Sequence, residues 1–294
     1  MTDLPPFTSL DARVEGCGLD AGTWHELRVR WGHPAGVPVR RVVRIVGGPR
    51  PPVPDQPPAA LPVPGGTLPL WTRGDQVWLG EHLHLEVTEE GVTLTGGPGV
   101  PEAAWVLAFV EAHRAGGWLP LHAAVLTRRG LERAVAVTGA SGAGKSTAAL
   151  RLAGAGLTIL AEDQAWVQPA SGLTLGLDTH LRAFEDSVRR FAPQWLGQAA
   201  GRDAHGKLQL PLTAAGGRAT LDTLLVFGLP PQPGAAQRVR AVWEATGVPL
   251  TPSGRRLAAA GVEALLPRLT VRGVTREDVL AAVQGRLAER VDQA

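Results

Sequence analysis

The chain has 294 residues, a formal net charge of +2 and a calculated pI of 9.3, with 44% hydrophobic and 19% charged residues. These values exclude wholesale disorder, and the length suffices for one large or two modest domains. No apolar stretch approaches the roughly 18 residues of a membrane span, and the first residues lack the regions of a secretory signal. The single cysteine, Cys17, suits a reducing compartment. We therefore expect a cytoplasmic protein with no membrane partner.

The 29 basic residues are scattered, without a lysine-rich tail or an aromatic-interleaved stripe, so we expect no nucleic-acid partner.

Residues 1–100 are predicted to form a β-rich N-terminal region. Alternating or β-branched runs at 24–31 and 39–46 predict strands. The proline-rich stretch 49–64 is interpreted as a long loop or linker, because proline removes backbone donors and favours extended coil. Residues 76–96 alternate well and carry a Glu-Gly turn, which predicts a β-meander.

A helix is predicted over 101–117, with a proline near its start and Gly-Gly at its end. Two apolar runs follow, Leu121–Thr127 and Ala134–Thr138, on either side of a polar turn around Gly130. This pattern predicts a β-hairpin that leads directly into a glycine-rich loop. Residues 101–294 are therefore predicted to form one α/β domain, an α+β mixed sheet with helices, next to the β-rich region.

The glycine-rich loop fits the pattern G-x-x-x-x-G-K-[ST], between a β-branched run and a helix-forming run. In such a loop, glycines let successive backbone N–H groups approach phosphate oxygens at a helix N-terminus. Lys145 is expected to reach the β- and γ-phosphates, and the hydroxyl of Ser146 to hold Mg²⁺. The predicted ligands are thus ATP and Mg²⁺, and the nucleotide-binding residues are Gly139, Ala140, Ser141, Gly142, Ala143, Gly144, Lys145, Ser146 and Thr147.

An acidic pair, Glu162-Asp163, follows the strand predicted at Leu157–Ala161, directly after the loop helix predicted at 146–155. If that strand is parallel to the one before the loop, both strands end at the same sheet edge, where ligands bind in open α/β folds. Neighbouring residues on extended chain point to opposite sides. One acid is then expected to hold Mg²⁺ with Ser146, and the other to accept a proton from an attacking hydroxyl.

His122 begins the first strand of the predicted hairpin. A turn near Gly130 sets this residue opposite roughly Thr138, at the mouth of the loop. We therefore predict that His122 steadies a phosphoryl group or orients the acceptor.

Further strands are predicted at 173–181, 207–214 and 222–229, with a loop interpreted as mobile at 197–206. A helix with a Thr-x-x-Asp start is predicted over 275–291.

The order of these motifs resembles the kinase domain of HPr kinase/phosphorylase and its wider group, a P-loop kinase akin to the phosphoenolpyruvate carboxykinase nucleotide site. That family has a histidine before a hairpin, a G-x-S-G-x-G-K-S loop and a strand ending in Ala-Asp-Asp. The resemblance is specific over 119–167 and vaguer to about 229, and none is seen for residues 1–100.

The resemblance implies a role for each matching residue. Lys145 and Ser146 match the phosphate and Mg²⁺ residues, and His122 matches the histidine near the transferred phosphate. Glu162 takes the place of the catalytic base and Asp163 that of the metal-side acid, although their roles are open to exchange. The implied activity is ATP- and Mg²⁺-dependent transfer of the γ-phosphate to a serine-type hydroxyl of a protein, peptide or small molecule. The family forms oligomers, so a homo-oligomer stays open here.

Two alternatives remain at this point. A small-metabolite kinase of the shikimate or gluconate type also carries acids on the strand after its loop helix. A nucleotide-binding sensor or scaffold would bind ATP without transferring phosphate.

Overall fold

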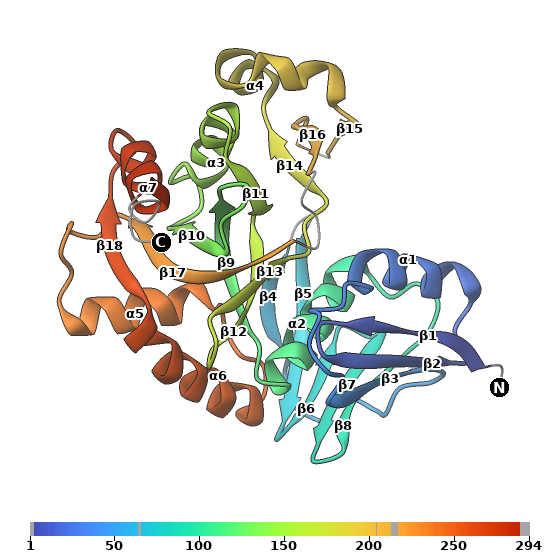
Figure 1. Cartoon of the computed structure of the whole chain (residues 1–294). Helices are drawn as coiled ribbons and strands as arrows, with labels where there is room; N and C mark the ends of the chain where they lie inside the picture. Colours follow the sequence, from blue (N-terminus) through green and yellow to red (C-terminus); the bar gives the residue numbers. More distant parts are fainter. Residues whose placement is uncertain (1–2, 64–65, 204, 213–216, 289–294) are drawn as a thin grey trace. The chain divides into compact units, whose positions relative to one another are not determined.

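The computed structural model describes residues 3–63, 66–203, 205–212 and 217–288 (Figure 1). Its contacts divide the chain into two compact units, Met1–Trp118 with Val248–Ala260 (unit 1) and Leu119–Gly247 with Gly261–Ala294 (unit 2). Each unit combines helices with mixed sheets, which confirms the predicted mixed α/β class. None of the helices that the structure describes has the length and apolarity required to cross a bilayer.

Unit 1 is built on an eight-stranded sheet with the order β1-β2-β3-β8-β7-β6-β5-β4. Strands β2, β3 and β8 are parallel to one another, and the other neighbours are antiparallel. The meander predicted at 76–96 is confirmed as β6, β7 and β8. The strands are β1 (Asp3–Ser9), β2 (Ala12–Cys17), β3 (Arg41–Gly47), β4 (Ala59–Val63), β5 (Gly66–Arg73), β6 (Gln76–Leu79), β7 (Leu83–Thr88) and β8 (Gly91–Gly96).

The strand predicted at 24–31 is wrong, because these residues lie in helix α1 (Ala21–Trp31). The side chain of Asp20 caps the helix by accepting from the backbone N–H of Thr23 at 2.8 Å. Trp24, Leu27 and Trp31 are buried at helical spacing, which outweighs the apparent alternation of the segment. The coil expected over 49–64 also needs correction, since β4 pairs with β5.

Helix α2 (Glu102–Ala115) confirms the helix predicted over 101–117. It lies in unit 1, whereas the sequence-based boundary after residue 100 assigns it to the second region. Phe109 is fully buried and stacks on Trp31 of α1, with ring centroids 4.7 Å apart. This aromatic contact and the packing of α2 on β6, β7 and β8 hold the helix in unit 1.

Two carboxylates of unit 1 bind the start of helix α6 (Pro252–Leu265), which explains why Val248–Ala260 belongs to this unit. Oε1 of the buried Glu111 accepts from the backbone N–H and the hydroxyl of Thr251, at 2.8 and 2.5 Å. Asp75 accepts in the same way from Ser253, at 2.8 and 2.5 Å. Both contacts satisfy backbone donors that a helix start leaves unpaired.

Unit 2 contains a seven-stranded sheet in which β9 and β10 form the predicted hairpin. Strand β10 also pairs with β17, which continues through β13 and β12 back to β9, so these five strands form a closed ring of pairs. The strands are β9 (Leu119–Thr127), β10 (Arg133–Thr138), β11 (Thr158–Ala161), β12 (Gln164–Gln168), β13 (Leu173–Gly176), β17 (Arg218–Phe227) and β18 (Thr270–Val274). A second sheet has the order β14-β16-β15, with β14 (His180–Ala183), β15 (Gly201–Arg202) and β16 (Leu208–Pro211).

The helix after the glycine loop, α3 (Lys145–Gly154), packs against β9, β11, β14 and α7 (Figure 1). Its buried face includes Leu150 and Leu152, and full burial of each stabilises the fold by about 1.5–3 kcal/mol. The other helices of unit 2 are α4 (Glu185–Phe191), η1 (Pro193–Gln198), α5 (Ala235–Ala245), the end of α6, η2 (Leu266–Arg268) and α7 (Val279–Ala288).

The strand predicted at 222–229 and the core of the last helix are confirmed. The single strand predicted at 173–181 needs correction, because the chain forms β13 and β14 there, in two different sheets. The loop expected at 197–206 contains the short strand β15. The ends of predicted segments at 64, 213–214 and 289–291, and residue 204, lie outside the described residues.

Candidate functional site

The glycine loop connects β10 to α3 and has a positive φ at three of its glycines. The φ angles of Gly139, Gly142 and Gly144 are 152°, 77° and 114°, a region in which side chains with a Cβ are strained. Gly144 is the N-cap of α3, and no side chain caps the helix there. The first N–H groups of α3 therefore have no side-chain partner at the N-cap, which suits an anion at this end.

Lys145 folds back over the start of the loop. Its Nζ donates to the carbonyl oxygens of Gly139 and Ala140, at 3.0 and 3.5 Å, and the residue is buried. The ammonium group is thus fixed at the β10 end of the loop.

Arg276 holds the other half of the loop and has no signal in the sequence pattern. Its Nε donates to the carbonyl of Ala143 at 2.9 Å, and its Nη2 to that of Gly142 at 2.7 Å. Arg276 lies just before α7, far along the chain, so only the tertiary structure brings it to the loop.

The acidic pair occupies the junction between β11 and β12, which run one after the other along β9. The pairs Ala161–Val125 and Gln164–His122 keep one register, after an irregularity between Ile159 and Ala161. The backbone N–H of Ala123 donates to the carbonyl of Asp163 at 3.0 Å. Strands β10 and β11 are both antiparallel to β9 and so run the same way, which meets the condition for both to end at one sheet edge.

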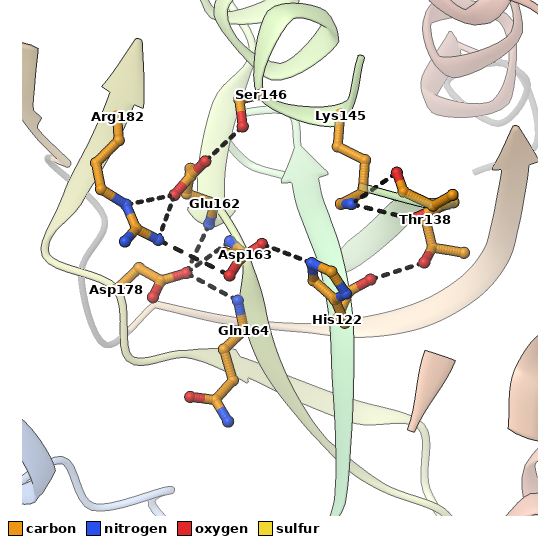
Figure 2. Close-up of polar contacts among 11 residues, drawn as sticks. His122, Thr138, Lys145, Ser146, Glu162, Asp163, Gln164, Asp178 and Arg182 are labelled. Atoms are coloured by element: carbon orange, nitrogen blue, oxygen red, sulfur yellow. Dashed lines mark hydrogen bonds and ion pairs between the residues drawn. The ribbon is translucent and has the colours of Figure 1, made fainter. Parts of the chain in front are cut away.

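The two acids contact different partners (Figure 2). Oε1 of Glu162 accepts from the hydroxyl of Ser146 at 2.6 Å. Oδ1 of Asp163 lies 2.9 Å from Nε2 of His122. The side chain of Glu162 is 4% exposed, whereas that of Asp163 is 45% exposed. The deep acid therefore faces the start of α3, and the accessible acid faces the histidine.

The predicted position of His122 is confirmed. Thr138 pairs with Ala123, and its hydroxyl donates to the carbonyl of His122 at 2.7 Å. The imidazole is half exposed beside the end of β10.

Arg182 of β14 contacts both acids and is missing from the sequence-based site. Its Nε and Nη2 donate to Oε2 of Glu162 at 3.1 and 3.0 Å, and Nη2 lies 3.8 Å from Oδ2 of Asp163. Figure 2 shows the guanidinium beside the pair, on the side away from Lys145. A positive charge is thereby held beside both carboxylates.

Asp178 fixes the backbone of the acidic pair. Its Oδ2 accepts from three successive N–H groups, those of Glu162, Asp163 and Gln164, at 2.8, 2.9 and 3.1 Å. Burial raises the pKa of Asp178, although the three N–H groups oppose the shift. The sequence does not single it out, because Asp178 lies inside the strand predicted at 173–181.

Burial and neighbouring charges shift the two acids in opposite directions. Burial raises the pKa of Glu162, against the opposing effects of the Ser146 hydroxyl and the Arg182 guanidinium. Burial would also raise the pKa of Asp163, but its contact with His122, together with Arg182 and Lys145, outweighs this effect and lowers the pKa.

Ser146 and Glu162 present two oxygens that fit a magnesium ion. Mg²⁺ takes octahedral oxygen ligands at about 2.0–2.1 Å, so neighbouring ligand oxygens stand about 2.9 Å apart. The Ser146 hydroxyl oxygen and Oε1 of Glu162 lie 2.6 Å apart, so the two oxygens would have to move only slightly apart to bind the ion. Within the described ranges, no group of three or more His, Cys, Asp or Glu side chains is placed to hold a metal ion.

Two pockets lie on the two sides of the loop. The larger, of about 500 Å³, is lined by His122, residues 138–141, the end of β17 and one face of α5. The smaller, of about 270 Å³, is lined by Gly142, Gly144, Thr147, Arg151 and Arg276, among others. Of the nine residues predicted to bind nucleotide, Gly139, Ala140 and Ser141 line the larger pocket, and Gly142, Gly144 and Thr147 line the smaller.

No protein-family model matches this chain, and a search of curated proteins gives no match.

Proposed function

We propose that unit 2 is an ATP- and Mg²⁺-dependent kinase that transfers the γ-phosphate to a hydroxyl group. The observation that carries this proposal is the pairing of two adjacent carboxylates with different partners beside a phosphate-type loop. Glu162 contacts the Ser146 hydroxyl, and Asp163 contacts His122. A protein that only binds nucleotide has no need of the second contact.

The contacts favour an exchange of the roles that the resemblance implies for the two acids. In our proposal Glu162, with Ser146, holds Mg²⁺, because these two oxygens already lie together in a buried position. When bound, the ion would neutralise charge on the β- and γ-phosphates. Lys145 would bind the same phosphates from the Gly139 side of the loop.

Asp163 is the proposed proton acceptor. Its lowered pKa keeps the carboxylate ionised at neutral pH, and its exposure leaves it open to an acceptor hydroxyl. As the hydroxyl oxygen bonds to the γ-phosphorus, the bond from that phosphorus to the β–γ bridging oxygen breaks and ADP leaves. The hydroxyl proton passes to Asp163, which His122 orients.

Arg182 is proposed to balance the charge of the acids before ATP binds. Once Glu162 turns its oxygens to Mg²⁺, the guanidinium would lose part of its pairing. It can then pair with the transferred phosphoryl group, whose charge it would stabilise.

The arrangement of the strands supports the resemblance to the HPr kinase group. A histidine at the start of a hairpin, a loop after the second strand and an acidic pair on the neighbouring strand all lie at one sheet edge. We propose on this basis that unit 2 is an HPr-kinase-like domain.

Calorimetry and labelled ATP test the proposal. MgATP should bind the full chain with a saturable isotherm, and γ-labelled phosphate should pass to an acceptor or slowly to water. Lys145→Ala should cut this transfer by about 10²–10³-fold, because the group that stabilises phosphate charge is lost. The control is Arg189→Gln, an exposed residue on α4, which should leave both MgATP binding and phosphate transfer unchanged. Arg151 is not a suitable control because its side chain lines the smaller pocket. Binding without any transfer would identify a nucleotide sensor instead, and absence of MgATP binding would overturn the proposal.

A further inference from the structure

The larger pocket lies at the end of the loop where the γ-phosphate is expected. Nζ of Lys145 is held by the carbonyls of Gly139 and Ala140, and both residues line this pocket. Since such a lysine reaches the β- and γ-phosphates, the γ end of ATP faces this side. Thr147 lines the smaller pocket, which leaves that pocket for the rest of the nucleotide.

The wall of the larger pocket includes a positive and a negative side chain one helical turn apart. On α5, Nε of Arg240 lies 2.7 Å from Oε1 of Glu244. The two side chains are 79% and 60% exposed. An exposed pair of this kind contributes little to the stability of the protein, so each group can exchange its partner for a ligand charge. The small side chains of Ala241 and Ala245 leave room beside them.

We propose that this pocket binds the acceptor, and that the acceptor is a small hydroxyl compound that carries both a carboxylate and an ammonium group. This inference rests on the proposed kinase function. Arg240 would bind the carboxylate and Glu244 the ammonium, while the hydroxyl faces His122 and the γ-phosphate. A hydroxyamino acid has this combination of groups.

The dimensions of the pocket favour a small molecule over a folded protein. The volume of about 500 Å³ lies within the roughly 300–1,000 Å³ of small-molecule sites, which is enough space for a γ-phosphoryl group together with an amino acid. In the transfer, the hydroxyl oxygen bonds to phosphorus, the bond to the bridging oxygen breaks, ADP leaves and the proton passes to Asp163. The product is a phosphomonoester of the amino acid.

L-serine and L-homoserine are the probes for this site. We expect at least one of them to bind the full chain saturably by calorimetry in the presence of Mg²⁺ and a non-hydrolysable ATP analogue. With ATP, phosphorus NMR should show its phosphomonoester. D-glycerate, which lacks the ammonium, and ethanolamine, which lacks the carboxylate, should bind at least tenfold more weakly.

Variants of the charged pair localise the binding. Arg240→Gln and Glu244→Gln should each raise the KM for the amino acid at least tenfold, while MgATP affinity stays within twofold. Ala241→Phe should block the amino acid by filling the pocket. The matched control is Arg189→Gln, which breaks another exposed pair one helical turn apart, with Glu185 on α4, and should leave the KM unchanged.

Each outcome separates this inference from the proposed function. If MgATP binds and is hydrolysed but neither amino acid binds, the acceptor assignment is wrong and the kinase proposal stands. The assignment is also wrong if Arg240→Gln leaves the KM unchanged, or if only seryl residues of intact proteins are phosphorylated. If MgATP itself does not bind, the kinase proposal is wrong.

Discussion

Nε2 of His122, on β9, lies 2.9 Å from Oδ1 of Asp163, at the junction between β11 and β12. Removal of this contact by His122→Ala should raise the pKa of Asp163, because the histidine is the strongest of the groups that lower it. A raised pKa means that the carboxylate takes up a proton at higher pH. The acid side of the kcat/KM profile for phosphate transfer should therefore move to higher pH.

A pH–rate series for the wild type and His122→Ala measures this shift. His25→Asn on the exposed face of α1 serves as the control. An acid side that stays in place would show that Asp163 is not the group whose ionisation limits the reaction.

Substitutions of Glu162 and Asp163 should affect different steps of the reaction. Glu162→Gln should weaken the binding of Mg²⁺ to the ATP-loaded protein by roughly tenfold or more, about 1.4 kcal/mol, because it removes a charged ligand. Asp163→Asn should keep this binding and lower kcat by about 10²–10⁴-fold, since a base acts only in the chemical step. Titration of Mg²⁺ and single-turnover transfer measure the two effects. The reverse result would restore the assignment implied by the resemblance, with Glu162 as base.

Arg276 should affect nucleotide binding more than chemistry. Its two hydrogen bonds, to the carbonyls of Gly142 and Ala143, hold the outer half of the loop. A hydrogen bond from a charged group contributes about 1.5–3 kcal/mol to stability, and a bond at an exposed site contributes less. Arg276→Ala should raise the Kd for MgATP several-fold and leave single-turnover transfer at saturating ATP nearly unchanged. Equal losses in both measurements would mean that Arg276 acts on the transferred group.

The stability of unit 1 should decrease in acid because of His113. Burial, and then the charge of Arg41, lower the pKa of this histidine well below its ordinary value. Its Nδ1 lies 2.7 Å from Nη2 of Arg41, and its Nε2 lies 2.9 Å from the hydroxyl of Ser9. The unfolded chain binds the proton more readily, so stability is present above the unfolded pKa and is lost as pH falls below it.

Urea unfolding between pH 5 and pH 8 checks this expectation. The slope should approach about 1.4 kcal/mol per pH unit below the unfolded pKa of histidine. His113→Gln should lower the overall stability and flatten this slope. Trp31, whose ring lies 5.9 Å from that of His113, provides a fluorescence signal. The same slope in wild type and variant would assign the acid sensitivity to other groups.

The sequence predicts the part of the site that depends on local pattern. A turn near Gly130 between two apolar runs is sufficient to place His122 beside Thr138, and the loop motif places Lys145 and Ser146 at the start of a helix. Register in a hairpin follows from the turn, so the prediction needs no distant contact.

The missed residues depend on tertiary contacts. Arg182 reaches the acids from β14, in a different sheet, and Arg276 reaches the loop from the start of α7. Neither has a fixed spacing from the residues that it contacts. The error at α1 has another cause, because Trp24, Leu27 and Trp31 follow helical spacing inside a segment that also alternates.

The irregularity between Ile159 and Ala161 inserts one extra residue into β11 just before the acids. Leu160 is the extra residue, so its deletion would let Ile159 and Ala161 follow one another opposite Leu126 and Val125, and Gln164 would keep its place opposite His122. The irregularity thus takes up one residue of chain between α3 and the acids without moving the acids along β9. A deletion of one residue after Ala161 would, by contrast, shift Asp163 along β9 relative to His122 and turn its side chain to the other face.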